Sequence, residues 1–242
     1  MTLTPGQSPP KLVVFDFASI VLGHSEGMLS ALVAAMRVHG LSVEPEVASV
    51  AMGFPAAVGI ERLVSWLRPQ ASAGGELQES IFHTFLKEHQ RFCRFSDLPE
   101  LAPGLDQTIT TLRKSGCRIA LGTNMEAACV QILSDRLGWG QEPPFDVWLS
   151  GDDVDDVRPG PGMIHHLMAA AEVENPQDVV KVGDTPVDIE EGRNAGCGHV
   201  MLLDNGWLDA MAISACRPDA ILEYVDDLLA YLPLRRHHSV DS

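Results

Sequence analysis

The chain has 242 residues, of which 45% are hydrophobic and 21% are charged, and its formal net charge at pH 7 is −16. This composition is typical of one or two compact globular domains and excludes a disordered or fibrous chain. The negative charge disfavours nucleic acids and anionic membranes as partners, so we expect a small-molecule substrate, whose phosphate would need a local cationic site.

The lack of a recognisable targeting signal and the pattern of cysteines indicate the cellular location that we expect for the protein. No apolar run reaches the ~18 residues that a membrane span needs, and residues 1–10 lack the charged and then apolar order of a signal peptide. We therefore expect a soluble, cytoplasmic protein. The five cysteines are odd in number and never closely paired, which predicts reduced, mostly buried thiols and indicates neither a disulfide framework nor a zinc site.

Strand-like apolar runs alternate with amphipathic helical segments, which predicts βαβ units and a mainly parallel sheet. The expected strands are 12–15, 118–121, 147–149, 179–182 and 199–203.

The interval between the first two strands has a different pattern. Apolar residues recur at helical spacing in 28–36, 60–67 and 81–86, which predicts a separate small helical bundle. Gly23 at its entry, and Pro99, Pro103 and Gly104 at its return, mark the boundaries. The expected organisation is a core of 11–22 and 98–233, an inserted helical unit of 23–97, and disordered tails at 1–10 and 234–242.

Asp16 ends the first strand-like run, Leu-Val-Val-Phe-Asp. Ligands of α/β proteins collect at the carboxyl ends of the strands, so Asp16 is the first catalytic candidate. An ordinary strand-end turn is the alternative, because Asp and Ser are good turn formers.

Two further polar sites follow expected strands or precede expected helices. Thr123 and Asn124 come directly after the strand 118–121 and its glycine, where a hydroxyl caps a helix or free N–H groups bind an anion. Arg158 precedes a helix in a chain with few positive charges, and an ordinary surface arginine is the alternative there.

Asp184 and Asp188 follow the strand 179–182 and lie four residues apart, so both carboxylates can face one crevice. Such hard oxygens suit Mg²⁺, and helix capping by Asp184 with a dipole interaction at Asp188 is the alternative. Taken together, the acid at 16, the hydroxyl at 123, the arginine at 158 and this pair predict a phosphoryl-transfer site, in which the acid attacks and the others hold oxygens and metal.

The order and contexts of these motifs resemble the haloacid dehalogenase (HAD) superfamily over residues 11–233. Within it the chain is most similar to phosphonoacetaldehyde hydrolase and phosphonatase-like proteins. Ala18 and the segments 51–55, 151–154 and 158–164 carry that closer similarity.

This resemblance implies an α/β fold with a Rossmann-like core, a parallel sheet and an inserted α-helical cap domain. It also implies an aspartyl-phosphate intermediate on Asp16 and a homodimer formed through the cap. Mg²⁺ would be bound by Asp16, the backbone carbonyl of Ala18 and Asp184, with Asp188 supporting the metal site.

The chain departs from the family pattern at three places. Ala18 stands where most phosphatases of the family have a second Asp that protonates the leaving group, an effect worth ~10²–10⁴-fold. Ala56 stands where phosphonatases have a lysine that forms a Schiff base; Lys87, the one lysine in 23–97, has the pattern of a solvated helix residue. Residues 19–21, Ser-Ile-Val, stand where the family typically has Gly-Thr-Thr or Gly-Thr-Leu, so Ile20 removes a hydroxyl and places a β-branched group at a tight turn.

Which group compensates is left open by the sequence. His24 and Glu26 follow the first loop, and either can overhang the site as an acid–base residue. We expect His24, Glu26 and Asn124 to bind the substrate. A solvated polar pair at a helix start is the alternative for the first two.

The leading hypothesis is a Mg²⁺-dependent hydrolase of a small phosphorylated or phosphonate metabolite. The alternatives are an enzyme of this fold that cleaves a non-phosphate bond and a catalytically silent binding protein.

Overall fold

The computed structural model describes residues 9–22, 24–70, 74–97, 100–140, 143–206, 208 and 210–234. Gly23, Pro99 and the expected disorder of 1–8 and 235–242 lie outside the described residues, as does the side chain of His24. In the described part of the chain, no helix combines the length and apolar character that a bilayer crossing requires.

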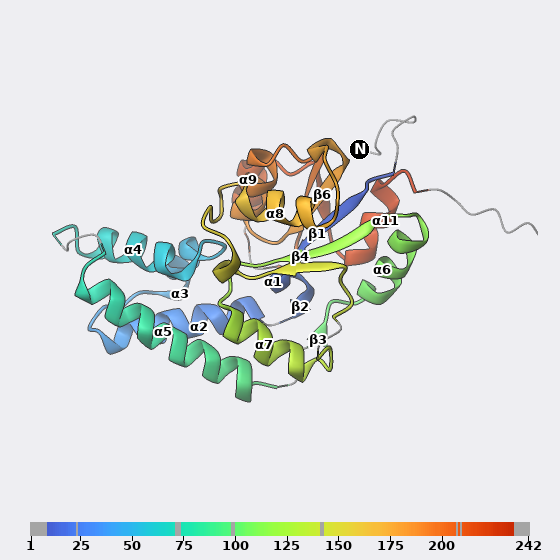
Figure 1. Cartoon of the computed structure of the whole chain (residues 1–242). Coiled ribbons are helices and arrows are strands. Elements are labelled where there is room, and N and C mark those ends of the chain that lie inside the picture. The colour runs from blue at the N-terminus through green and yellow to red at the C-terminus, as the bar shows by residue number, and fades with distance from the viewer. Residues whose placement is uncertain are drawn as a thin grey trace, which may run out of the picture.

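A six-stranded parallel sheet forms the centre of the larger domain, in the order β5-β4-β1-β6-β7-β8 (Figure 1). The strands are β1 (Leu12–Asp16), β4 (Arg118–Gly122), β5 (Val147–Leu149), β6 (Val179–Gly183), β7 (His199–Leu203) and β8 (Ala220–Leu222). This confirms the predicted α/β class and the five expected strands, and adds β8. The central strands β1 and β6 are buried along their whole length, as is typical of parallel strands that helices cover on both faces.

Alternate residues of β1 pack into two different hydrophobic cores. Val13 and Phe15 face one core, whereas Leu12 and Val14 face the other. The surrounding helices are α6 (Leu105–Lys114), α7 (Ala127–Arg136), α8 (Gly162–Ala170), α9 (Pro186–Asn194), α10 (Ala210–Cys216) and α11 (Leu228–Tyr231). Short 3₁₀ turns cover Ser49–Ala51, Gly151–Asp153, Pro176–Asp178 and Val225–Asp227.

A bundle of helices lies to one side of the sheet (Figure 1). Its helices are α2 (His24–Val38), α3 (Pro45–Ala48), α4 (Ala56–Leu67) and α5 (Glu76–Phe95). The bundle has its own hydrophobic cluster, in which Met36, Ile60 and Phe85 are buried, so the three stretches of helical spacing in the sequence correspond to α2, α4 and α5.

The chain passes between sheet domain and bundle through a small ribbon. The strands β2 (Val21–Leu22) and β3 (Glu100–Leu101) pair in antiparallel fashion where the chain leaves and returns. The cysteines are free thiols, four buried and Cys216 partly exposed, as the sequence predicted.

Candidate active site

Asp16 ends β1 and is the N-cap of the short helix α1 (Phe17–Ile20), so its side chain lies at the carboxyl edge of the sheet. Its Oδ2 accepts hydrogen bonds from the backbone N–H groups of Ala18, at 2.8 Å, and Ser19, at 3.3 Å. These bonds satisfy the first N–H groups of the helix and fix the direction of the carboxylate. Ile20, where the chain departs from the family pattern, is fully buried in a hydrophobic core.

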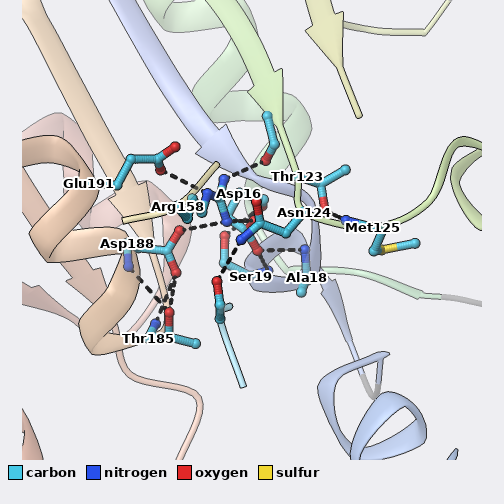
Figure 2. A network of polar contacts seen from close by, with 12 residues as sticks. Asp16, Ala18, Ser19, Thr123, Asn124, Met125, Arg158, Thr185, Asp188 and Glu191 are labelled. Atoms are coloured by element: carbon cyan, nitrogen blue, oxygen red, sulfur yellow. Dashed lines mark hydrogen bonds and ion pairs between the residues drawn. The ribbon is translucent and has the colours of Figure 1, made fainter. Parts of the chain in front are cut away.

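Arg158 is buried between carboxylates (Figure 2). Its Nη1 lies 2.5 Å from Oδ1 of Asp16 and 3.1 Å from Oδ1 of Asp188, and its Nε lies 2.9 Å from Glu191. Nη2 donates to the carbonyl of Gly122, at 2.9 Å. Burial opposes the charge of the guanidinium, but the three carboxylates raise the pKa of Arg158 well above its ordinary value. The interpretation of Arg158 as an ordinary surface arginine is therefore wrong.

Lys181 and Glu191 complete this cluster, and the sequence analysis missed both. Lys181 Nζ lies 2.9 Å from Asp188 Oδ1 and 3.1 Å from Glu191 Oε2, with all three side chains buried. Burial alone would raise the pKa of Asp188, but Lys181 and Arg158 lower it to about 2. A lysine in the middle of an apolar strand is the sequence signal for this pairing, because unpaired lysines are almost never buried.

Asp184 follows β6, and its two carboxylate oxygens have different surroundings. Oδ2 accepts hydrogen bonds from Ser25, at 3.3 Å, and Asn205, at 2.8 Å. Among the described residues, Oδ1 has no hydrogen-bond partner although it is buried, which is costly unless another ligand binds it. Burial, and then repulsion from Asp16 and Asp188, raises the pKa of Asp184 to about 7.

The helix-capping alternative for these acids is partly correct. The N-cap of α9 is Thr185, and Asp184 precedes it. Asp188 forms the capping box: its Oδ2 accepts hydrogen bonds from the Thr185 hydroxyl, at 2.6 Å, and from the Thr185 N–H, at 3.2 Å. Asp188 therefore caps the helix and also belongs to the charged cluster.

The carboxylates at the sheet edge fit a divalent cation. One oxygen each of Asp16, Asp184 and Asp188 lies within 4.8 Å of the others. Four buried acidic side chains in this cluster face two buried basic ones, a formal excess of two negative charges. Hard carboxylate oxygens of this kind are the ligands that Mg²⁺ prefers.

Thr123 and Asn124 lie on the loop after β4. Thr123 is buried, and its Oγ1 accepts a hydrogen bond from the N–H of Met125, at 3.2 Å. It does not cap α7, whose N-cap is Glu126. The side-chain amide of Asn124 donates to the backbone carbonyl of Gly53, at 2.6 Å, and so joins the sheet edge to the bundle.

A cavity lies between the sheet edge and the bundle, lined by both. The sheet domain contributes Asp16, Ala18, Thr123, Asn124, Met125, Glu126, Arg158, Asp184, Thr185 and Asp188, and the bundle contributes Ser25, Met28, Met52, Gly53, Phe54, Ala56 and Phe85. The structure thus brings the predicted acids, hydroxyl, amide and arginine together at one site.

Two predicted or considered residues lie elsewhere. Glu26 is exposed on α2 and outside this lining, so the structure does not support its expected place over the site, which Ser25 takes instead. Lys87 is exposed on α5, as expected of a solvated residue. Ala56 does line the cavity. None of the described residues that line it is a lysine, so none there replaces the lysine that phosphonatases have at this position.

Known proteins resemble the chain over most of its length. A family model described as haloacid dehalogenase-like hydrolase matches residues 10–196. The chain is 30% identical to phosphonoacetaldehyde hydrolase of Latilactobacillus sakei subsp. sakei (strain 23K) over an alignment of 207 residues. The alignment covers 81% of this chain and 76% of that protein. It is 26% identical over 246 residues to phosphoglycolate phosphatase of Escherichia coli (strain K12), with 95% of each covered.

Solved structures share the fold at lower sequence identity. A hydrolase from Pseudomonas syringae has a TM-score of 0.77 and 15% identity, with 90% of this chain and 96% of that chain covered. A phosphonoacetaldehyde hydrolase-like protein from Oleispira antarctica has a TM-score of 0.73 and 19% identity, with 94% of each covered.

Proposed function

Because this chain belongs to the haloacid dehalogenase-like hydrolase family, we propose that it hydrolyses a small phosphorylated or phosphonate metabolite with Asp16 as the nucleophile. The observation that carries the proposal is the contact of the buried Asp16 carboxylate with the Arg158 guanidinium at the edge of the sheet. A nucleophile and a cation for the phosphoryl oxygens thereby face the same cavity, together with Thr123.

Asp16 attacks phosphorus, the bond to the leaving group breaks, and water then hydrolyses the aspartyl phosphate. The N–H bonds from Ala18 and Ser19 hold one carboxylate oxygen, so the other is the one that faces Arg158. Burial raises the pKa of Asp16, and the guanidinium opposes that increase and favours the ionised, nucleophilic form. Arg158 and the hydroxyl of Thr123 bind phosphoryl oxygens in the transition state.

Mg²⁺ is the cofactor that we propose, held by Asp16, the backbone carbonyl of Ala18 and Asp184, with Asp188 in support. The unpartnered Oδ1 of Asp184 and the excess negative charge of the cluster support this assignment. When bound, the ion offsets the negative charge between the carboxylates and the phosphoryl group.

The leaving group has to depart with little protonation. Ala18 and Ala56 both line the cavity and carry neither an acid nor an amine. We therefore propose activated esters or acyl phosphates as substrates, and no cleavage of phosphonoacetaldehyde through an imine.

The test is release of phosphate from acetyl phosphate and 4-nitrophenyl phosphate, with Mg²⁺ and with EDTA. Asp16→Asn should lose about 10³-fold or more in kcat, as loss of a nucleophile does, whereas Asp106→Asn, at an exposed position on α6, should keep full activity. Full activity of Asp16→Asn would contradict the mechanism. Turnover that EDTA leaves unchanged would instead favour a non-phosphate reaction, and metabolite binding without turnover would favour a binding protein.

The quaternary structure is a separate proposal. We propose a homodimer formed through the helical bundle, on the family resemblance alone. Sedimentation of the purified chain tests it, and a monomer at micromolar concentration would contradict it.

A further inference from the structure

A second group of buried side chains lies between the bundle and the sheet domain. His89 and Cys93 lie one helical turn apart on α5, so both point from the same face. Cys129 faces them from α7. One ligand atom of each lies within 4.8 Å of the other two, and all three side chains are buried.

Two distances measured from His89 are close to those between ligands of a tetrahedral metal centre. Nδ1 of His89 lies 3.5 Å from Sγ of Cys129 and 3.6 Å from Oε2 of Glu126. Zinc bonds of ~2.1 Å to nitrogen or oxygen and ~2.3 Å to sulfur, at tetrahedral angles, separate nitrogen from sulfur by ~3.6 Å and nitrogen from oxygen by ~3.4 Å.

Glu126 is the candidate for the fourth donor: its carboxylate lies beside His89 but outside the group whose ligand atoms are all within 4.8 Å of one another, so its side chain has to turn to join the other three. It is the N-cap of α7, three residues before Cys129, and therefore lies on the same side of the helix. Its Oε2 is buried and accepts no hydrogen bond from the described residues, with the His89 ring as its polar neighbour.

We propose that His89, Cys93, Cys129 and Glu126 form a zinc site that joins α5 to α7. Two thiolates and an imidazole are soft and borderline donors, which favour zinc over the hard cation that suits the carboxylates at the sheet edge. With the Glu126 side chain turned toward the ion, four protein ligands close the coordination shell, which is the pattern of a structural zinc site. The spacing of the cysteines alone gave no indication of it, because Cys93 and Cys129 come from different domains.

A zinc ion at this position would also affect the cavity of the candidate active site. The helix α5 belongs to the bundle and α7 to the sheet domain, and Arg136 already joins them by donating to the carbonyls of Cys93 and Ser96, both at 2.6 Å. Glu126 also lines the candidate active site. Zinc would therefore fasten the bundle to the sheet domain and neutralise a carboxylate that borders the cavity.

The first test is metal content after expression in zinc-supplemented medium and purification without an affinity tag or chelator. Elemental analysis should find about one zinc ion per chain, as a closed site retains its metal. Reconstitution of the full chain with Co²⁺ should give a thiolate-to-cobalt charge-transfer band and the visible bands of tetrahedral cobalt. Neither readout depends on hydrolase activity, so the zinc site and the proposed function can fail separately.

Matched cysteine variants identify the ligands. Cys129→Ala should reduce the zinc content about tenfold or more, as loss of a ligand does, whereas Cys117→Ala, which removes an equally buried thiol, should leave it unchanged. If Cys129→Ala does not fold, zinc protection of the thiols against a thiol reagent in the wild-type chain replaces this measurement, and the proposal expects two thiols that react only after zinc is removed.

Three results would overturn the proposal. These are a folded chain that binds no zinc or cobalt, equal loss of zinc in Cys117→Ala and Cys129→Ala, and a Cys93–Cys129 disulfide in the freshly purified chain.

Discussion

The side-chain amide of Asn124, at the edge of the sheet, donates a 2.6 Å hydrogen bond to the backbone carbonyl of Gly53, in the loop before α4. This bond crosses from the sheet domain to the bundle beside the cavity that holds Asp16. It therefore holds the bundle against the sheet domain through Asn124, the residue directly after Thr123.

Replacement of Asn124 should increase the fraction of molecules in which the bundle has moved away from the sheet domain. Asn124→Ala removes a bond worth about 1 kcal/mol, or roughly fivefold in the closed population. Asn124→Asp should be worse, because its carboxylate faces the Gly53 carbonyl as a second acceptor. Hydrogen exchange of the amides of 52–60 measures the opening, and exchange equal to wild type in both variants would show that this bond does not hold the bundle.

Gly53 has a positive φ of 83°, and a Cβ there would lie 2.5 Å from Oγ1 of Thr185. Gly53→Ala should therefore displace the loop from the cavity and reduce kcat/KM by about tenfold, a transition-state loss of about 1.4 kcal/mol. Gly40→Ala is the matched control, since Gly40 has φ 72° and open space around the added carbon. Both variants should lose about 1 kcal/mol of stability from backbone strain, but the loss of activity is expected in Gly53→Ala alone. Equal kinetics in the two would contradict a role for the close approach.

The pKa of Asp184, raised to about 7, predicts how Mg²⁺ binding depends on pH. In the metal-free protein the raised pKa favours the folded state at low pH, and this stabilisation is lost as the pH rises through about 7. Above that pH the ionised carboxylate is free of its proton and binds the cation more tightly. Mg²⁺ should therefore raise Tm more at pH 8 than at pH 6, measured by thermal unfolding.

Asp184→Asn provides the control for this experiment. It removes the titrating group and one ligand, so the Mg²⁺-dependent change in Tm should become small and nearly independent of pH. A shift in Tm as large at pH 6 as at pH 8 in the wild type would contradict competition between proton and metal.

Lys181 balances Asp188 and Glu191 inside the protein. Lys181→Met keeps the length of the side chain but leaves buried negative charge without its partner, which typically costs about 3–5 kcal/mol. Lys87→Met, at an exposed position on α5, should change the free energy of unfolding by less than about 0.5 kcal/mol. Urea unfolding measures both, and a loss in Lys181→Met no larger than that in Lys87→Met would show that the pair is not needed for stability.

The sheet and the bundle could be predicted because their patterns are local. Apolar runs that end in a glycine or an acid identified β1, β4 and β6, and the spacing of Met36, Ile60 and Phe85 identified helices. The short strand β8 was missed because Ile221, its middle residue, is exposed and an exposed three-residue strand has a weak apolar signal.

The site could be predicted where its residues stand at strand ends, and less well elsewhere. Asp16 ends β1, and Thr123 and Asp184 directly follow β4 and β6, so the parallel sheet brings the three together. Ser25 and Glu26 are adjacent on α2, and which of them faces the cavity depends on the rotation of that helix against the sheet domain, which no local pattern records. The contact of Arg158 with Glu191 joins side chains from segments that are distant in sequence, and only the packing of α9 against the sheet shows it.

The pairing of β2 with β3 has a consequence for how such a protein can diversify. Val21 lies opposite Leu101, so the 79-residue excursion between them starts and finishes on adjacent strands, ~5 Å apart. The length and sequence of a segment attached in this way can change without disturbing the sheet. Even if the whole segment were removed, a tight hairpin could join the two strands. The part of the cavity lining that the bundle contributes can therefore change in evolution while the sheet that carries Asp16 stays unchanged.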